Sequence, residues 1–148
     1  MNYRLTQIPE RTTQPRANGL TMVMDKGLSI NQAKDFLSVA GPHVDIVKLG
    51  FGTSFVTPNL REKLAVYREA NMPVYFGGTL FEAFLIRNQF DDYVEVCRDY
   101  GVSYIEVSDG SITIDKLTHS KESVLMKLLE IDSVVCITES DISKYREG

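Results

Sequence analysis

Apolar runs recur along this chain, and each of the first four ends in a cluster of small or charged residues. They begin roughly 25 to 30 residues apart, a spacing typical of successive strand–helix units. The runs with their terminal clusters are LTMVMDKG (20–27), DIVKLGFGTS (45–54), PVYFGGT (73–79) and SYIEVSDGS (103–111). Helix-like patterning fills the segments between them. The sequence therefore predicts an α/β protein with a parallel sheet.

The intervening segments predict helices with recognisable ends. Residues 29–40 place apolar side chains on one face, with Ser29 as the N-cap. Residues 58–70 repeat the pattern, with Pro58 in the first turn. The expected stops are Gly41-Pro42 and Asn71, further helices are expected at 80–89, 90–100 and 121–130, and a fifth apolar run lies at 133–137.

The length of 148 residues suits one domain with a substantial core. Within it we expect an irregular N-terminal arm at 1–18, βα units at 19–114 and a divergent tail at 115–148. Five strands are predicted, whereas a closed barrel of βα units has about eight. The chain is therefore expected to form either an open sheet or part of a barrel.

The composition of the chain argues against several classes of function. The formal net charge of -4 and the absence of a basic stripe argue against a nucleic-acid partner. There is no apolar span of about 18 residues, and the polar N-terminus lacks a signal peptide's apolar core, so we expect a cytoplasmic protein without membrane contact. Cys97 and Cys136 lack metal-ligand spacing and are expected to be buried thiols. His43 and His119 are expected at the surface.

The four clusters are expected to form one site, because the carboxyl ends of parallel strands meet at one edge of a sheet and bind the ligand there. Lys48 is the first candidate, since it lies within the second strand beside the glycine turn. A lysine in this position can hold a phosphate or carboxylate, or donate a proton. The alternative is a salt bridge with Asp25 or Glu106.

Two glycine-rich segments, GFGTS (50–54) and GGT (77–79), offer backbone N–H groups and hydroxyls just before a helix start. Such a combination can cradle an anion. The alternative is that the glycines serve tight turns that need positive φ. The expected substrate-binding residues are Lys26, Gly50, Gly52, Thr53, Ser54, Gly77, Gly78, Thr79 and Ser108.

Four carboxylates lie on or just after these strand ends: Asp25, Glu82, Glu106 and Asp109. Oxygen ligands of this kind suit Mg²⁺ beside a phosphorylated substrate. Glu106 is the strongest candidate because it lies within a strand. The alternative for the carboxylates in loops is that they are simply solvated.

At these same residues the chain resembles the phosphosulfolactate synthase family. The blocks that carry the resemblance are PRANGLTMVMDKGLS, DIVKLGFGTS, VYFGGTLFE and YIEVSDGSI, and the similarity covers roughly residues 7–114. The resemblance implies a TIM (β/α)8-barrel fold and a lyase that adds sulfite to phosphoenolpyruvate with Mg²⁺. The implied product is phosphosulfolactate, which leads to coenzyme M in methanogens.

The resemblance also implies roles for the residues named above. Lys48 would supply a cation or a proton, and Glu106 and Asp25 would hold the metal directly or through water, with Asp109 and Glu82 as further candidate ligands. Sulfite would attack the terminal methylene carbon of phosphoenolpyruvate while charge develops on the carboxylate side. A proton would then reach the adjacent carbon.

Family members are longer, and their blocks beyond the fifth strand are not found here. The resemblance therefore implies a partial barrel of about five βα units, whose unpaired strand edges favour a homo-oligomer. Residues 115–148 are either a diverged fifth unit, with Glu139 in place of a family glutamate, or out-of-frame sequence. The alternatives to the lyase are an inactive partial barrel that binds anions or self-associates, and a related barrel enzyme for another phosphorylated carboxylate.

Overall fold

The computed structural model describes residues 5–102, 104–108, 110–112 and 135–138. The strands are β1 (Met22–Asp25), β2 (Ile46–Leu49), β3 (Val74–Phe76), β4 (Tyr104–Val107) and β5 (Val135–Thr138). The helices are α1 (Ile30–Ala40), α2 (Leu60–Glu69), α3 (Gly78–Leu85) and α4 (Phe90–Tyr100), with 3-10 segments η1 (Gly41–His43) and η2 (Gly50–Val56). The predicted α/β class is confirmed.

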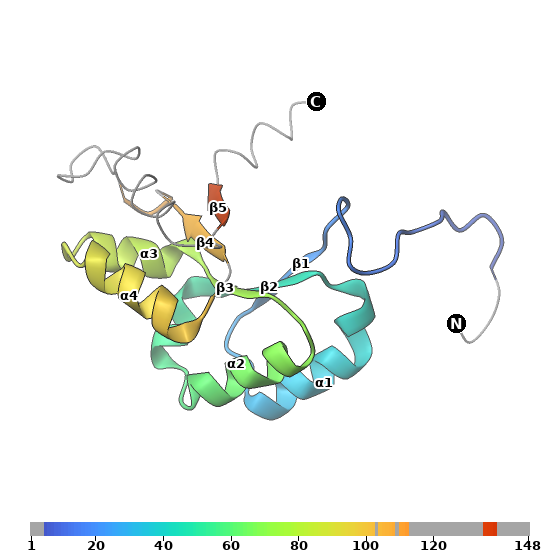
Figure 1. Cartoon of the computed structure of the whole chain (residues 1–148), viewed down its shortest axis with the longest axis horizontal. Helices are drawn as coiled ribbons and strands as arrows, with labels where there is room; N and C mark the ends of the chain where they lie inside the picture. Colours follow the sequence, from blue (N-terminus) through green and yellow to red (C-terminus); the bar gives the residue numbers. More distant parts are fainter. Residues whose placement is uncertain (1–4, 103, 109, 113–134, 139–148) are drawn as a thin grey trace.

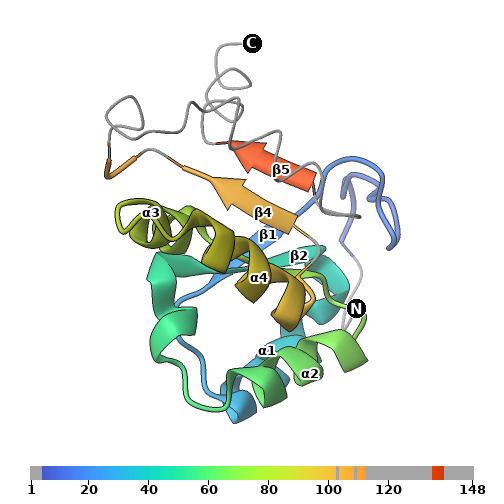
Figure 2. The same cartoon turned by 60° about the vertical axis from the view of Figure 1, so that its left-hand side comes forward.

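The five strands form one sheet in chain order, and every neighbouring pair is parallel. This order is that of a (β/α)8 barrel, here left open between β1 and β5 in the described part of the chain. Figure 1 shows the helices below and to the left of the sheet, and Figure 2 shows β5 beside β4. The expectation of a partial barrel with a fifth strand is confirmed.

The sheet has two different faces, because successive side chains of a strand point to opposite sides. One face packs under the helices and forms the core, with buried residues from the sheet and from α2, α3 and α4. These include Val47, Leu49, Val74, Phe76, Ile105, Val107, Leu64, Tyr67, Phe81 and Tyr93. The opposite face, called the inner face below, carries Met22, Met24, Ile46, Lys48, Tyr75, Tyr104 and Glu106.

The helix ends follow local chemistry. Ser29 and Gln32 form a capping box at the start of α1, in which each side chain bonds the other's backbone N–H. Gly101 ends α4 in the left-handed region at φ 59. The expected position of Pro58 in the first turn of α2 is wrong. Asn59 adopts a left-handed φ of 54, so the helix starts only at Leu60.

Within the described residues, none of the helices combines the length and apolar character needed to cross a bilayer. Cys97 is buried on α4 as expected, and this burial raises the pKa of its thiol to about 12. His43 is exposed in η1. The expected helix at 121–130, His119, Glu139 and the side chain of Cys136 lie outside the described residues.

Candidate functional site

Lys48 on β2 and Glu106 on β4 form an ion pair on the inner face. Lys48 Nζ lies 2.7 Å from Glu106 Oε1, to which it donates a hydrogen bond, and 2.7 Å from Oε2. Their side chains are only 15% and 6% exposed. Because β3 lies between β2 and β4, the pair spans a whole strand. Of the alternatives for Lys48, the salt bridge with Glu106 is observed.

Gly77 makes this span sterically feasible. It directly follows β3 at the position that continues the inner face beyond Tyr75. A Cβ at Gly77 would lie 2.8 Å from Lys48 Cε and 3.1 Å from Leu49 O, closer than ordinary contacts allow. The Gly77 N–H itself donates to Leu49 O at 3.0 Å. Gly77 therefore leaves room for the lysine side chain, and its N–H is not free to cradle an anion as expected.

Tyr75 lies on the inner face between the two members of the pair. Its side chain is buried, with only 3% of the residue exposed. Burial, and then the charge of Glu106, raise the pKa of Tyr75 to about 12. The phenol is thus a neutral hydrogen-bond donor at physiological pH.

The first turn of α3 packs against the exit of β4. A Cβ at Gly78 would lie 2.3 Å from Ser108 Cβ and 3.2 Å from Glu106 Oε1. Glu82, one turn on, accepts a 2.5 Å hydrogen bond from Ser108 Oγ and a 3.2 Å bond from the Ser111 N–H. The Leu80 N–H of this turn donates to Gly77 O at 3.0 Å, whereas the N–H groups of Gly78 and Thr79 belong to the first turn of α3, where a helix lacks intrahelical acceptors. Thr79 lies in this turn and is exposed.

The η2 segment forms the other glycine-rich exit. Phe51 and Gly52 adopt left-handed φ values of 54 and 65, so these residues do serve a tight turn. Thr53 Oγ1 donates to Gly50 O at 2.8 Å. Ser54 is buried, and its Oγ has no hydrogen-bond partner among the described residues. A buried hydroxyl without a partner is a candidate ligand group.

Asp25 is not brought together with Glu106, because its side chain points toward the helices. Lys63 Nζ lies 2.6 Å from Asp25 Oδ2, and the Tyr67 hydroxyl donates to the same oxygen at 2.9 Å. Oδ1 accepts from the Gly27 and Leu28 N–H groups at 2.8 and 2.7 Å.

Four donors therefore occupy Asp25. Burial alone would raise the pKa of Asp25, but the hydrogen bonds from Lys63, the two backbone N–H groups and Tyr67 lower it overall. The geometry thus gives Asp25 a structural position and does not support the metal or catalytic role expected for it.

The expected carboxylate ligands do not converge. Asp25 and Glu82 have their oxygens occupied as described, and Asp109 lies outside the described residues. Among the residues described, no group of three or more acidic, histidine or cysteine side chains is placed to hold a metal ion. Glu106 Oε2 is buried, and among the described residues it has no hydrogen-bond partner beyond its 2.7 Å ion pair with the Lys48 ammonium.

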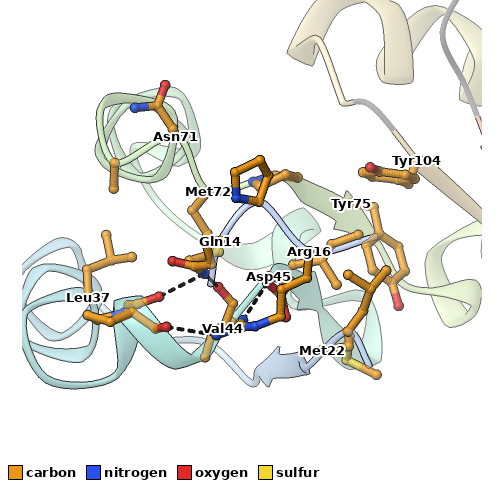
Figure 3. Close-up of a pocket in the computed structure, with 17 residues that line it drawn as sticks. Gln14, Arg16, Met22, Leu37, Val44, Asp45, Asn71, Met72, Tyr75 and Tyr104 are labelled. Atoms are coloured by element: carbon orange, nitrogen blue, oxygen red, sulfur yellow. Dashed lines mark hydrogen bonds and ion pairs between the residues drawn. The ribbon is translucent and has the colours of Figure 1, made fainter. Parts of the chain in front are cut away.

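A cavity of about 1110 Å³ lies at the opposite, strand-entry end of the sheet (Figure 3). Its wall is mostly apolar, and several of its polar groups are paired with one another. Arg16 of the N-terminal arm forms a 2.6 Å ion pair with Asp45, and the Gln14 amide donates to the carbonyls of Gly41 and Val44. These contacts fasten the arm to the end of α1 and the start of β2. We therefore place the candidate site at the strand-exit end.

Two residues of the site were not among the expected ones. The sequence pattern could have identified Tyr75. It lies two residues before Gly77 along the third strand, so both residues are on the same face of the sheet. Phe51, between two glycines, has no such signal. Its exposure and its contact with the neighbouring loop appear only in three dimensions.

Comparison with known proteins gives the family of the chain. Two curated relatives named phosphosulfolactate synthase are those of Methanocaldococcus jannaschii, 37% identical over 121 residues, and Bacillus subtilis, 35% identical over 112 residues. Each match covers 76% of this chain, but 48% and 44% of the relatives, so the chain spans about half their length. Residues 9–143 match the family described as (2R)-phospho-3-sulfolactate synthase (ComA), beyond residue 114 where the quoted blocks end. The chain belongs to the (2R)-phospho-3-sulfolactate synthase family.

Proposed function

We propose that this chain carries the reaction centre of a lyase that adds sulfite to phosphoenolpyruvate to give phosphosulfolactate. The observation that carries the proposal is the largely buried Lys48–Glu106 pair at the strand-exit end of a family member. Relatives that bear the name phosphosulfolactate synthase support the choice of reaction. The two charges lie where barrel enzymes place their chemistry.

The reaction asks for a cation and a proton donor at one point. The sulfite sulfur forms a bond to the terminal methylene carbon of phosphoenolpyruvate, and the electrons of the double bond move toward the neighbouring carbon and its carboxylate. A proton then completes that carbon. The Lys48 ammonium stabilises the developing charge or delivers the proton, and Glu106 holds the ammonium in place.

Anionic groups of the substrate would be held by donors around this pair. The N–H groups of Gly78 and Thr79 at the start of α3 would be the donors beside Glu106, and the dipole of α3 favours negative charge there. The unpartnered Ser54 hydroxyl offers a further hydrogen bond from η2. We include Gly78, Thr79 and Ser54 in the proposed substrate site.

We further propose that Mg²⁺ binds through the carboxylate of Glu106, whose buried Oε2 has no hydrogen-bond partner among the described residues beyond its ion pair with Lys48. Magnesium commonly uses one or two protein carboxylates and completes its shell with substrate oxygens and water. One carboxylate thus suffices for a metal that arrives with the phosphorylated substrate. Its chemical contribution is to offset the negative charge of the substrate.

The open sheet also favours self-association as a proposal for the partner. β1 lies at an edge of the sheet within the described part of the chain. Met22 on the inner face of this strand is 44% exposed. A second copy would cover both the edge and the exposed methionine.

The test is the turnover of phosphoenolpyruvate with sulfite by the purified chain, with and without Mg²⁺. We expect Lys48→Ala to abolish turnover while the circular dichroism spectrum is retained, and Glu106→Gln to lose most of the turnover and to weaken the dependence of the remaining rate on Mg²⁺. The matched control is Lys34→Ala, which removes an exposed lysine from α1 and should leave turnover unchanged. Full activity in Lys48→Ala would contradict the proposal.

A further inference from the structure

The side chain of Lys26 rests over an aromatic ring at the strand-exit edge of the sheet. Lys26 directly follows β1, and its Nζ lies 5.4 Å from the centroid of the Phe51 ring in η2. An ammonium within about 6 Å of a ring face is attracted by the negative face of the ring. No carboxylate of the described residues lies within ion-pair distance of Lys26. The ring therefore holds this cation without neutralising its charge.

Phe51 occupies a strained and exposed position. Its φ is 54, in the left-handed region, and the residue is 63% exposed. Three of the five non-glycine residues with positive φ in the described part of the chain are asparagines, which tolerate this conformation. A bulky aromatic residue does not, and strained backbone of this kind is concentrated at functional sites. Packing does not account for Phe51, because most of its surface faces solvent.

The backbone around Lys26 is fixed as well. Asp25 Oδ1 accepts hydrogen bonds from the N–H groups of Gly27 and Leu28, at 2.8 and 2.7 Å. A Cβ at Gly27 would lie 3.8 Å from Thr53 Cγ2, so this turn lies beside η2. Lys26 is thus held by its backbone through Asp25 and by its side chain through Phe51.

This pair of loops adjoins the reaction centre. Phe51 directly follows Gly50, whose Cα would lie 3.6 Å from a Cβ at Gly77. The same Cβ would lie 2.8 Å from Lys48 Cε. Lys48, Gly77, Gly50, Phe51 and Lys26 therefore lie close to one another in this order at the strand-exit edge of the sheet.

We propose that Phe51 is a positioning residue that holds the Lys26 ammonium as a second cation, for an oxyanion with two negative charges. The inference rests on the proposed function only in that the oxyanion would be the phosphate group of phosphoenolpyruvate or sulfite itself. Lys48 serves the reacting carbon and its carboxylate, and Lys26 takes the more distant oxyanion.

One experiment tests both the contact between Lys26 and the Phe51 ring and the binding of an anion at Lys26. The full chain is labelled with ¹³C-lysine, titrated with inorganic phosphate and followed by nuclear magnetic resonance. We expect the ε-protons of Lys26 to be shifted upfield by the ring and to move on addition of phosphate. Phe51→Leu should abolish the upfield shift and weaken phosphate binding about two- to fivefold, the range that an exposed cation–π contact supplies. Phe51→Trp should restore both. The matched control, Phe55→Leu, replaces a ring that is 82% exposed in the same segment and should change neither.

A second variant separates positioning from a structural role. Phe51→Gly relieves the left-handed strain, so it should raise the thermal unfolding midpoint while it weakens phosphate binding. A lower midpoint together with weaker binding would make Phe51 a structural residue and overturn the inference. Equal phosphate affinity of Phe51→Leu and the unaltered chain would also overturn it. So would Lys26 resonances that do not shift when phosphate is added. Phosphate binding at Lys26 without turnover of phosphoenolpyruvate and sulfite would instead contradict the proposed function alone.

Discussion

The substitution Gly77→Ala tests whether this glycine serves the Lys48–Glu106 pair. The φ and ψ of Gly77, -68 and 157, suit any residue, so backbone strain does not arise. The new methyl group would lie 2.8 Å from Lys48 Cε, whereas carbon atoms in contact are about 3.5 to 4.0 Å apart. Lys48 Cε must therefore move by about 1 Å, and we expect this movement to disturb the hydrogen bond from its ammonium to Glu106.

The magnitudes follow from this displacement. Overpacking of a buried site costs about 1–3 kcal/mol, and we expect the free energy of unfolding to fall by that amount. A catalytic group misplaced by about 1 Å loses about 100-fold in turnover. Urea unfolding measures the first quantity, and the rate of phosphosulfolactate formation measures the second.

Gly41→Ala is the control for a methyl group added away from the pair, because outside its chain neighbours this group would meet Leu37 Cδ2 at an ordinary distance of 3.9 Å. Gly41 is helical and precedes Pro42, so alanine adds a local backbone cost there, and the control is read on turnover, which should stay unchanged. In a Lys48→Ala background the main clash at Gly77 is gone, so Gly77→Ala should cost less there than in the unaltered chain. Equal costs in both backgrounds would refute the steric explanation.

Three further substitutions test the supporting structure. Asp25→Asn leaves Lys63 buried without its partner, so it should cost about 3–5 kcal/mol in urea unfolding, and less than 1 kcal/mol would contradict the buried pair. Because folding lowers the pKa of Asp25 below 3.8, the stability that it supplies should be lost as the pH falls through this range, and the Asn variant should show a shallower acid dependence. Folding raises the pKa of Tyr75 from 10.0 to about 12, so stability should fall as the pH rises through this window, and less steeply in Tyr75→Phe. Ser29→Ala removes the capping box and should cost about 1 kcal/mol; an unchanged urea midpoint would exclude the cap as a source of stability.

Much of the fold was predictable because its signals are local. Ser29 with Gln32 three residues later marks a helix start, and Gly101 marks a helix end. The strand–helix spacing indicated parallel strands, which the register confirms. The start of α2 was predicted two positions too early, at Pro58, because the left-handed residue Asn59 delays the helix. No local sequence pattern indicates that turn.

The site was predicted less completely because its geometry depends on relations between strands. The run LTMVMD is apolar on both faces, as parallel strands often are, so it does not indicate to which side Asp25 points. Its partners Lys63 and Tyr67 come from α2, about 40 residues away in the chain. The pairing of Lys48 with Glu106 was one of two alternatives until the register placed both on the inner face.

The glycines illustrate the same limit. Gly77 and Gly78 look like an anion-binding loop in the sequence, but one leaves space for Lys48 and the other for Ser108. Close approach and phosphate binding both require glycine, so the residue type alone cannot separate them. The roles proposed for Gly78, Thr79 and Ser54 in binding stay predictions.

A double-mutant cycle on Lys48 and Glu106 tests the central claim most directly. The rate of carbon–sulfur bond formation from phosphoenolpyruvate and sulfite is measured for the unaltered chain, Lys48→Met, Glu106→Gln and the double variant. If the two residues act as one unit, each single variant should lose nearly as much activity as the double variant. Losses that simply multiply, or a Lys48→Met variant as active as the unaltered chain, would contradict a reaction centre built on this ion pair.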